Sequence, residues 1–411
     1  MTAPPLPLAA FSVRLFLVLA LILIAAQSCG WAARRLLGQP PVVGEMIAGV
    51  LLGPSLLGLA FPSASALLFP LEVKRLLYVL AQLGVGLYMF VVGLGFDPAT
   101  FRHHRGSAVA VSLSGMAAPF LLALLLTPWL MATPGLFAPR LTLAQAVLFT
   151  GACISITAFP MLARIIQERG LAGAPLGALA LAAGAIDDAA AWAVLAIVLA
   201  SFGDGPWVAV KAIGGGLAFA LLVIGAGRRA LAPLARFTPE AGLAAALILF
   251  LLAAFAMDWV GMHAVFGGFL LGVAMPRGAF AEGLRARIEP VTVALLLPIF
   301  FTYSGLNTQL ALVADPALAL LALAVLVASI AAKFGACWLA ARLTGQDQPT
   351  ALGIGALMNA RGLMELIIIN IGLQRALIGP PLFAMLVVMA IVTTLMAAPM
   401  FELVQRRVPR G

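Results

Sequence analysis

The sequence predicts an all-α protein that crosses a membrane many times. Of its 411 residues, 64% are hydrophobic and only 9% are charged, and the mean hydropathy is +1.13. Soluble globular proteins carry about 25% charged residues, so a water-soluble fold of this composition would lack polar side chains to cover its surface. The apolar residues also gather in stretches of about 20, the length of a membrane-spanning helix. These observations exclude a soluble enzyme, a nucleic-acid-binding protein and a secreted disulfide scaffold.

Thirteen apolar segments follow one another along the chain, separated by short loops that hold most of the Gly, Pro and Arg residues. The ninth segment is short, and segments eight and nine together could form one long helix. We expect transmembrane helices at about 12–32, 41–60, 76–96, 107–131, 142–166, 174–202, 206–226, 240–260, 262–276, 288–306, 317–343, 350–374 and 380–404.

The basic residues indicate how the chain crosses the membrane. With the N-terminus outside, sixteen of the 24 Lys and Arg residues fall in the inward loops and six fall on the outer side. Positive charges concentrate on the cytoplasmic side of membrane proteins. We therefore expect a multi-pass protein of the cell (inner) membrane, with its N-terminus outside and its C-terminus in the cytoplasm. The same asymmetry accounts for the net charge of +9 without a nucleic-acid partner.

Thirteen spans divide into six, one and six. The first six, about 12–202, and the last six, about 240–404, would form inverted repeats joined by a linker helix at about 206–226, because an odd-numbered linker flips the second copy. We expect residues 1–411 to form a single transmembrane domain, with no cytosolic regulatory domain after the last span.

The fifth span of each repeat is interrupted, in GACISITAFPMLAR and in GIGALMNARGLMEL. Broken helices at matching places in two halves are typical of secondary transporters. We therefore expect the two broken helices to cross near the middle of the membrane. The interrupting residues are Ser155, Thr157 and Pro160 in the first span and Asn359, Arg361 and Gly362 in the second.

Two adjacent carboxylates lie inside the sixth span. Asp187 and Asp188 occur in LALAAGAIDDAAAWAVLAI, with about a dozen apolar or small residues on either side. Neighbouring residues of a helix point about 100° apart, so one carboxylate can meet an internal partner while the other faces an aqueous cavity. Such a group binds either a proton or a hard monovalent cation, and this competition is the chemistry of an exchanger. Alternatively, the pair is structural and caps neighbouring helices.

Four other ionisable residues stand out inside the predicted spans. Lys333, in SIAAKFGACW, is expected to pair with one of the two aspartates, at the ion site or in a purely structural ion pair. Arg361 and Glu365 are spaced i,i+4 and can pair on one helix face, so we expect them to hold the broken span together. Glu45, in VVGEMIAGVLLGP, is expected to be a structural or gating charge.

The interruptions predict further ligands for a cation. Unwound backbone at membrane depth is tolerated only where it lines a cavity or is buried in protein, and the freed carbonyls can coordinate cations. The hydroxyls of Ser155 and Thr157 could add oxygens beside Asp187 and Asp188. We expect no enzymatic activity and no cofactor. The isolated cysteines offer neither metal-ligand spacing nor a disulfide framework: Cys29, Cys153 and Cys337.

Several motifs in the same order resemble the second monovalent cation:proton antiporter family. They are VVGEMIAGVLLGPSLLG, SITAFPMLARIIQERG, GALALAAGAIDDAAAWAVLAIVLA, LLPIFFTYSGLNTQL, AAKFGACWLAARLTG and ALMNARGLMELIIINIGLQRALI. The last is most similar to the plant cation/H⁺ exchanger and fungal potassium/proton antiporter branch and its bacterial relatives. The resemblance covers about residues 13–404. One departure is Gly95 in VVGLGFDP, where the family usually has Glu.

The resemblance implies a sodium/proton antiporter-like fold and a homodimer with separate dimerisation and core domains, the core carrying the cation by an elevator-like movement. It implies that Asp188 binds the ion and the proton, that Asp187 pairs with Lys333, and that Thr157 lies where the broken helices cross. The aspartate pair with this lysine is typical of sodium exchangers, whereas the motif around Arg361 is typical of the potassium branch. The resemblance therefore leaves Na⁺ and K⁺ both open.

The sequence as a whole predicts a secondary antiporter that exchanges a monovalent cation for protons, with membrane lipids around it. A cation channel or leak pathway on the same scaffold is the first alternative, and a non-transporting sensor is the second. An intramembrane aspartyl protease fits less well, because its two carboxylates would face each other across helices, whereas Asp187 and Asp188 are neighbours on one helix.

Overall fold

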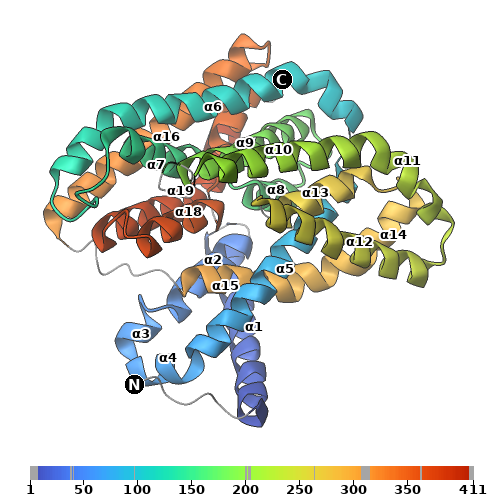
Figure 1. The fold of residues 1–411 in the computed structure, drawn as a ribbon, viewed down its shortest axis with the longest axis horizontal. Helices are drawn as coiled ribbons and strands as arrows, with labels where there is room; N and C mark the ends of the chain where they lie inside the picture. Colours follow the sequence, from blue (N-terminus) through green and yellow to red (C-terminus); the bar gives the residue numbers. More distant parts are fainter. Residues whose placement is uncertain are drawn as a thin grey trace. The chain divides into compact units, whose positions relative to one another are not determined.

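The computed structural model describes residues 8–37, 39, 41–96, 98–199, 201, 205–262, 264–306, 315–361 and 363–406. This part of the chain is almost entirely helical (Figure 1), in agreement with the predicted all-α class. Within it, eight helical segments are long and apolar enough to cross a membrane. They are Phe11–Leu36, Pro41–Ala60, Leu71–Gly95, Gly106–Ala132, Pro206–Arg236, Pro239–Val260, Pro316–Leu343 and Pro380–Val404.

Helices occupy all thirteen of the predicted segments, although several are short or interrupted, so the number of spans stays a prediction. The second segment is one such case: α2 (Pro41–Leu52) ends before Gly53 and Pro54, and the short α3 (Leu57–Ala60) follows. Segments eight and nine are separate helices, α12 (Pro239–Val260) and α13 (Ala264–Ala274). The reason is Gly261, whose left-handed backbone (φ 91°) ends α12.

The tenth helix begins before the predicted boundary and changes its winding. It starts as α14 (Ala279–Val291), continues through a π-helical stretch η4 (Thr292–Leu296) and ends as α15 (Leu297–Gly305). Pro290 lies two residues before η4 and has no N–H to donate. The widened turn after it accommodates the missing hydrogen bond, as π-bulges do inside longer helices.

The chain forms two compact units, each assembled from two stretches of sequence. The first unit comprises Met1–Phe96 with Gly215–Gln309, and the second comprises Asp97–Gly214 with Leu310–Gly411. One of the three places where the chain passes between the units falls inside α10 (Pro206–Leu221). Each unit therefore draws on both predicted repeats, whose boundaries are not tested by this division.

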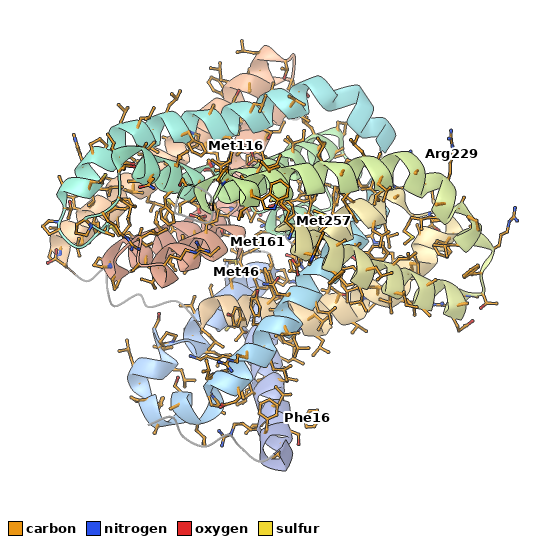
Figure 2. The ribbon with its side chains drawn as sticks, in the orientation of Figure 1. Phe16, Met46, Met116, Met161, Arg229 and Met257 are labelled. Carbon is orange, nitrogen blue, oxygen red and sulfur yellow. The ribbon has the colours of Figure 1, made fainter. Side chains whose placement is uncertain are left out.

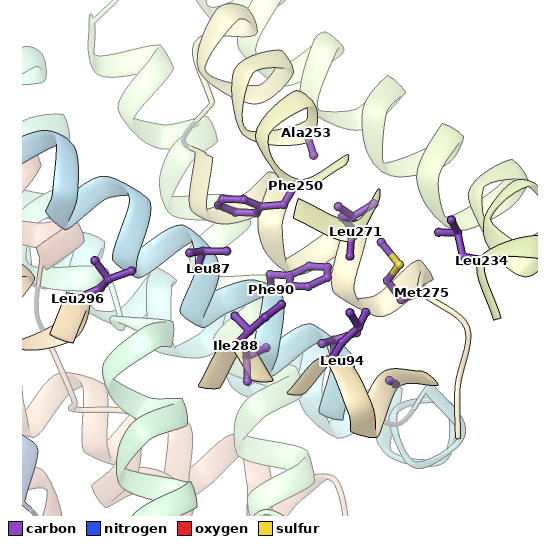
Figure 3. Packing of buried hydrophobic residues seen from close by; sticks show 14 residues of the cluster. Leu87, Phe90, Leu94, Leu234, Phe250, Ala253, Leu271, Met275, Ile288 and Leu296 are labelled. Carbon is purple, nitrogen blue, oxygen red and sulfur yellow. The ribbon is translucent and has the colours of Figure 1, made fainter. Parts of the chain in front are cut away.

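The first unit packs around α5 (Leu71–Gly95), which lies against α13, α14 and α15. Its apolar core includes Phe90, Phe250 and Leu271 (Figure 3). The rings of Phe90 and Phe250 lie 6.2 Å apart between centroids, at an interplanar angle of 50°. The other helical elements of this unit are α1 (Leu8–Leu37), α4 (Pro62–Leu68), η2 (Leu222–Gly227), α11 (Arg228–Leu231) and η3 (Ala232–Arg236).

The close crossing of α5 and α13 depends on two glycines. A Cβ atom on Gly272 would overlap the carbonyl oxygen of Phe90, and one on Gly93 would overlap that of Phe269. Small residues let two helix backbones approach within a membrane, where dispersion contacts and hydrogen bonds replace the hydrophobic driving force.

The second unit contains two interrupted helices packed against three long ones. The interrupted helices are α7 (Leu143–Ser155) with α8 (Phe159–Glu168), and α17 (Gln348–Leu357) with α18 (Leu363–Gln374). Around them lie α6 (Pro98–Ala132), α9 (Pro175–Leu199) and α16 (Pro316–Leu343), with α19 (Pro380–Arg406) beside α17 and α18.

Two loops of the second unit, the one before α7 and the one after α18, are joined by hydrogen bonds. Phe137, in the loop before α7, forms an isolated antiparallel bridge with Ile378, in the loop after α18. The backbone N–H of Ala138 donates to the carbonyl of Leu377 at 3.0 Å, and Arg140 Nη2 donates to the carbonyl of Arg375 at 2.9 Å. The start of α7 is thereby attached to the end of α18.

Large apolar side chains are exposed along the outer faces of several helices. Phe16 on α1, marked in Figure 2, is 70% exposed, and Leu125 on α6 is 73% exposed. Phe255 on α12 and Leu320 on α16 are similarly uncovered. Exposed apolar surface of this extent is incompatible with water and matches the hydrocarbon of a bilayer.

Candidate functional site

The first interrupted helix has a well-defined start and stop. At its start, the side chains and backbones of Thr142 and Gln145 hydrogen-bond reciprocally in a capping box. α7 ends at Ser155, and the backbone is extended at Ile156 and Ala158 before α8 begins. Pro160 occupies the second position of α8, where its lack of an N–H is tolerated. The chain is therefore unwound over residues 156–158, in agreement with the predicted interruption.

The second interrupted helix stops at Leu357 and resumes at Leu363. Asn359 and Arg361 lie in the gap, as predicted, and Gly362 lies outside the described residues. The two gaps meet directly. Thr157 Oγ1 donates to the carbonyl of Met358 at 2.9 Å, and the N–H of Ala158 donates to the carbonyl of Ala360 at 2.9 Å.

Asp187 is fully buried on α9 beside this crossing, and both of its carboxylate oxygens are occupied. Oδ2 lies 2.9 Å from Lys333 Nζ and accepts the backbone N–H of Thr157 at 3.2 Å. Oδ1 accepts the hydroxyl of Ser112, on α6, at 3.2 Å. Asp187 and Lys333 are both 0% exposed, so their ion pair is entirely removed from water. A buried pair of this kind persists only where further hydrogen bonds satisfy both partners, as they do here.

Lys333 uses its three N–H donors on three different elements. Besides Asp187, its Nζ donates to the carbonyl of Gly115 at 3.3 Å and to the carbonyl of Ser155. Gly115 is on α6 and Ser155 is the last residue of α7. One ammonium from α16 thus joins α6, α7 and α9 around a single point.

Asp188 differs from its neighbour. It is 2% exposed, and no hydrogen-bond donor reaches its Oδ1 atom in the structure as described. Leaving a buried polar atom without a partner costs about 1–3 kcal/mol. One of the two adjacent carboxylates is thus satisfied by protein groups, as predicted, and the other keeps an oxygen for a proton, water or a cation. Asp188 is buried, however, and does not open to water as the prediction had it.

The backbone carbonyls at the end of α7 are neutralised by two cations. The last four carbonyls of a helix have no partner within it. Here Cys153 and Ile154 accept from Arg361 Nη1 and Nη2 at 3.0 and 2.5 Å. Ser155 accepts from Lys333, and Ala152 accepts from the hydroxyl of Ser155. The negative end of the α7 dipole therefore faces two buried positive charges.

Arg361 is held by the second gap and by α19. Its backbone N–H donates to Thr394 Oγ1 at 3.2 Å, and the Thr394 hydroxyl contacts the carbonyls of Arg361 and Ala390. Its Nη1 lies 3.5 Å from Glu365 Oε1, so the predicted i,i+4 ion pair is present, with both side chains 0% exposed. The guanidinium reaches from one interrupted helix to the other.

α9 approaches α8 closely at Gly184, one turn before Asp188. A Cβ atom at this position would lie 2.6 Å from Leu162 Cδ2, closer than real Cβ contacts. The face of α9 that carries Asp188 is therefore pressed against α8.

The structure brings together seven of the eight side chains that the sequence singles out: Ser155, Thr157, Asp187, Asp188, Lys333, Arg361 and Glu365. The eighth, Glu45, is buried on α2 in the other unit.

Ser112, Gly115 and Thr394 were not anticipated. Each is a small residue in an apolar helix, so only the arrangement of the helices identifies it.

A bundle of apolar helices with two gaps crossing at a buried carboxylate pair defines a membrane transport protein by its architecture. The model of the family described as "Sodium/hydrogen exchanger, transmembrane" matches residues 18–404. The chain belongs to this family.

Two relatives are similar to this chain in sequence, and one solved structure is similar to it in fold. The chain is 38% identical to the Na(+)/H(+) antiporter NhaS4 of Synechocystis sp., over 88% of this chain and 90% of that protein. It is 34% identical to Cation/H(+) antiporter 17 of Arabidopsis thaliana, over 94% of this chain, and spans about half (48%) of that relative. The fold is similar to that of the sodium proton antiporter MjNhaP1 from Methanocaldococcus jannaschii at pH 8. The TM-score is 0.67 and the identity 15%, with 97% of this chain and 100% of the other covered.

Proposed function

We propose that this chain exchanges a monovalent cation, Na⁺ or K⁺, for protons, with Asp188 as the carboxylate that binds each in turn. The observation that carries the proposal is the buried Oδ1 atom of Asp188, which no donor among the described residues reaches, beside a neighbour whose oxygens are both occupied. The membership of the exchanger family and the names of the relatives support it.

Charge balance supports competition between the two ions. The buried ionisable side chains at the crossing are Asp187, Asp188 and Glu365 against Lys333 and Arg361. With all five ionised, their charges sum to −1, and one monovalent cation or one proton brings the sum to zero. Net charge in a low-dielectric interior is strongly disfavoured. The site therefore holds one cation or one proton, and each expels the other.

Alternating access would then follow if the binding site itself, with its bound ion, moved from one side of the membrane to the other. Ser155, Thr157, Asp187 and Asp188 all lie in the second unit, so a displacement of that unit would carry the complete site. We propose an elevator-like movement of this kind, in a homodimer in the cell membrane with its C-terminus in the cytoplasm. Deprotonation on one side would admit the cation, and protonation on the other would release it.

The test is proton flux in proteoliposomes, followed with a pH-sensitive dye while Na⁺, K⁺, Li⁺ and choline are added in turn. Proton movement with one or more small cations and none with choline is expected for the wild type. Asp188→Asn should abolish it while leaving a folded protein. Asp315→Asn makes the same chemical change at the N-cap of α16, where asparagine caps as well as aspartate, and should retain exchange.

A cation channel would give a different result in the same liposomes. A channel passes the cation without moving protons, and its single-channel currents exceed what an exchanger can carry. Cation flux with no coupled proton movement, or exchange that survives in Asp188→Asn, would overturn the proposal. Absence of any response to all cations between pH 6 and 9 would instead favour a sensor.

A further inference from the structure

Asn359 lies in the gap of the second interrupted helix, and only one of its two amide groups has a hydrogen-bond partner among the described residues. The residue is 0% exposed. Its Nδ2 donates to the carbonyl of Gly355 at 2.8 Å, whereas no hydrogen-bond donor among the described residues reaches its Oδ1 atom. The assignment of the two amide atoms follows from the same contact, because the reverse orientation would place Oδ1 against the Gly355 carbonyl oxygen.

The two residues on either side of Asn359 are the ones that join the interrupted helices. The carbonyl of Met358 accepts the hydroxyl of Thr157, and the carbonyl of Ala360 accepts the N–H of Ala158. The backbone N–H of Thr157 in turn donates to Asp187. Asn359 is therefore fixed at the crossing itself, and α17, which leads into it, packs against α9, the helix that carries both aspartates.

Asn359 Oδ1 is a hydrogen-bond acceptor without a donor among the described residues, and so is Asp188 Oδ1. A buried oxygen without a donor is unfavourable, and two at one crossing call for a shared partner that is positive or carries protons. An amide carbonyl is a neutral hard ligand of the kind that cations bind beside a carboxylate. Glu365 also has oxygens that no donor among the described residues reaches, but it lies 3.5 Å from the Arg361 guanidinium and so already has its cation.

We propose that Asn359 Oδ1 is a ligand of the transported cation and helps to set which monovalent cation is selected. This inference rests on the proposed exchange at Asp188 and adds a neutral oxygen from the second interrupted helix to the carboxylate from α9. The site then takes ligands from both predicted repeats. A neutral ligand leaves the charge sum unchanged, so Asn359 affects the bound cation and leaves the bound proton unaffected.

A purely structural role for Asn359 would act through its Nδ2 contact with Gly355. Three variants separate the two roles. Asn359→Ala removes both the donor and the acceptor, Asn359→Asp keeps an acceptor oxygen, loses the donor and adds a negative charge, and Asn359→Gln keeps both groups and displaces the oxygen. Thr127→Ala is the matched control, because it removes a buried hydroxyl oxygen on α6 for which the described part of the chain also offers no partner.

The experiment measures the apparent KM for Na⁺, K⁺ and Li⁺ in the proteoliposome assay, together with the Tm of the purified protein at increasing concentrations of each cation. At a given concentration, a cation that binds more tightly raises Tm further, which gives a readout independent of transport. Loss of one ligand in Asn359→Ala should raise the KM for the preferred cation about tenfold, the equivalent of one lost contact. Asn359→Asp should retain the wild-type KM or lower it, and Asn359→Gln should change the ratio of the KM values for the three cations.

Two outcomes would overturn the inference. The first is an unchanged KM ratio and an unchanged cation-dependent rise in Tm in both Asn359→Ala and Asn359→Gln. The second is an equal loss of Tm and activity in Asn359→Ala and Asn359→Asp with normal selectivity, which identifies the donor as the important group. If the alanine variant does not fold, the glutamine variant still decides the question. A wild type without any cation response would instead refute the proposed exchange itself.

Discussion

The two interrupted helices end in different ways. At the end of α7, three of the last four carbonyls accept from Arg361, in the second gap, and Lys333, on α16. At the end of α17, the carbonyls of residues 354–357 accept from Met358, Asn359 and Ala360, which are the next residues of the same chain. The last carbonyls of α7 are therefore capped by charged side chains from elsewhere in the chain. Those of α17 are capped by neutral N–H groups of the residues that follow directly.

This difference assigns different tasks to the two gaps. The end of α17 is stable with local hydrogen bonds alone and can present Asn359 at a fixed position. The end of α7 depends on side chains from α16 and from the second gap, so its geometry responds to any change in the charges around Asp187. We therefore expect the protein to tolerate changes at the two gaps unequally.

The largest effect is expected from Arg361→Ala. This change leaves two carbonyls of α7 and the buried Glu365 carboxylate without their cation, and breaking a buried pair costs about 3–5 kcal/mol. Thermal unfolding of the purified protein should show a large fall in Tm, and Glu365→Gln in the same chain should restore part of it. Arg229→Ala, at an exposed position on α11 (Figure 2), is the control. Equal Tm values for the two arginine variants would show that α7 does not need this cation.

Lys333→Ala is expected to have the next largest effect. Asp187 loses its cation but keeps the N–H of Thr157 and the hydroxyl of Ser112, so the loss should be smaller than for Arg361. Replacing Asp187 by Asn in the same chain should recover most of the Tm, because it removes the orphaned charge. We also expect a change in the charge moved per cycle, measured as current in liposomes. A variant with normal Tm and normal current would mean that Lys333 is not needed for either.

Thr157→Val tests the neutral contact between the gaps. It leaves the carbonyl of Met358 without a donor, which costs about 1–3 kcal/mol, and keeps the size of the side chain. We expect a moderate fall in Tm and a higher KM for the cation. Thr157→Ser keeps the hydroxyl and should behave like the wild type. If the serine and valine variants are equally impaired, the methyl group rather than the hydrogen bond is what matters.

The smallest effect is expected from Thr142→Ala, at the opposite end of α7. It removes the capping box with Gln145 and costs about 1 kcal/mol of stability. Because the crossing is untouched, KM and selectivity should stay at wild-type values while Tm falls slightly. Thr142→Ser, which keeps the cap, is the matched variant. A changed KM in Thr142→Ala would show that the start of α7 is coupled to the ion site.

Much of the architecture follows from the sequence because a membrane restricts the choices. Apolar stretches of about 20 residues form helices in lipid because, apart from closed β-barrels, only helices pair all of their backbone N–H and C=O groups. Interruptions at Thr157 and Asn359 were predictable from polar and helix-breaking residues inside such stretches. The high energy of isolated buried charges predicted that Lys333 pairs with one of the two aspartates, and the family resemblance implied that this partner is Asp187.

The sequence could not predict which atoms meet. Lys333 was expected to pair with an aspartate, but its contacts with the carbonyls of Gly115 and Ser155 depend on how α6, α7 and α16 pack. Backbone atoms of small residues leave no mark on composition or periodicity. The early start of α14 was missed because its first turns carry charged residues and so lack the apolar signal of a span.

The clasp between Phe137 and Ile378 has a mechanical consequence. It fastens the beginning of α7 to the end of α18, so these half-helices share one anchor outside the crossing. Anything that pulls on one loop is transmitted to both gaps at once. Under the proposed cycle the two loops move together. A covalent link between Ala138 and Leu377 would therefore leave exchange intact.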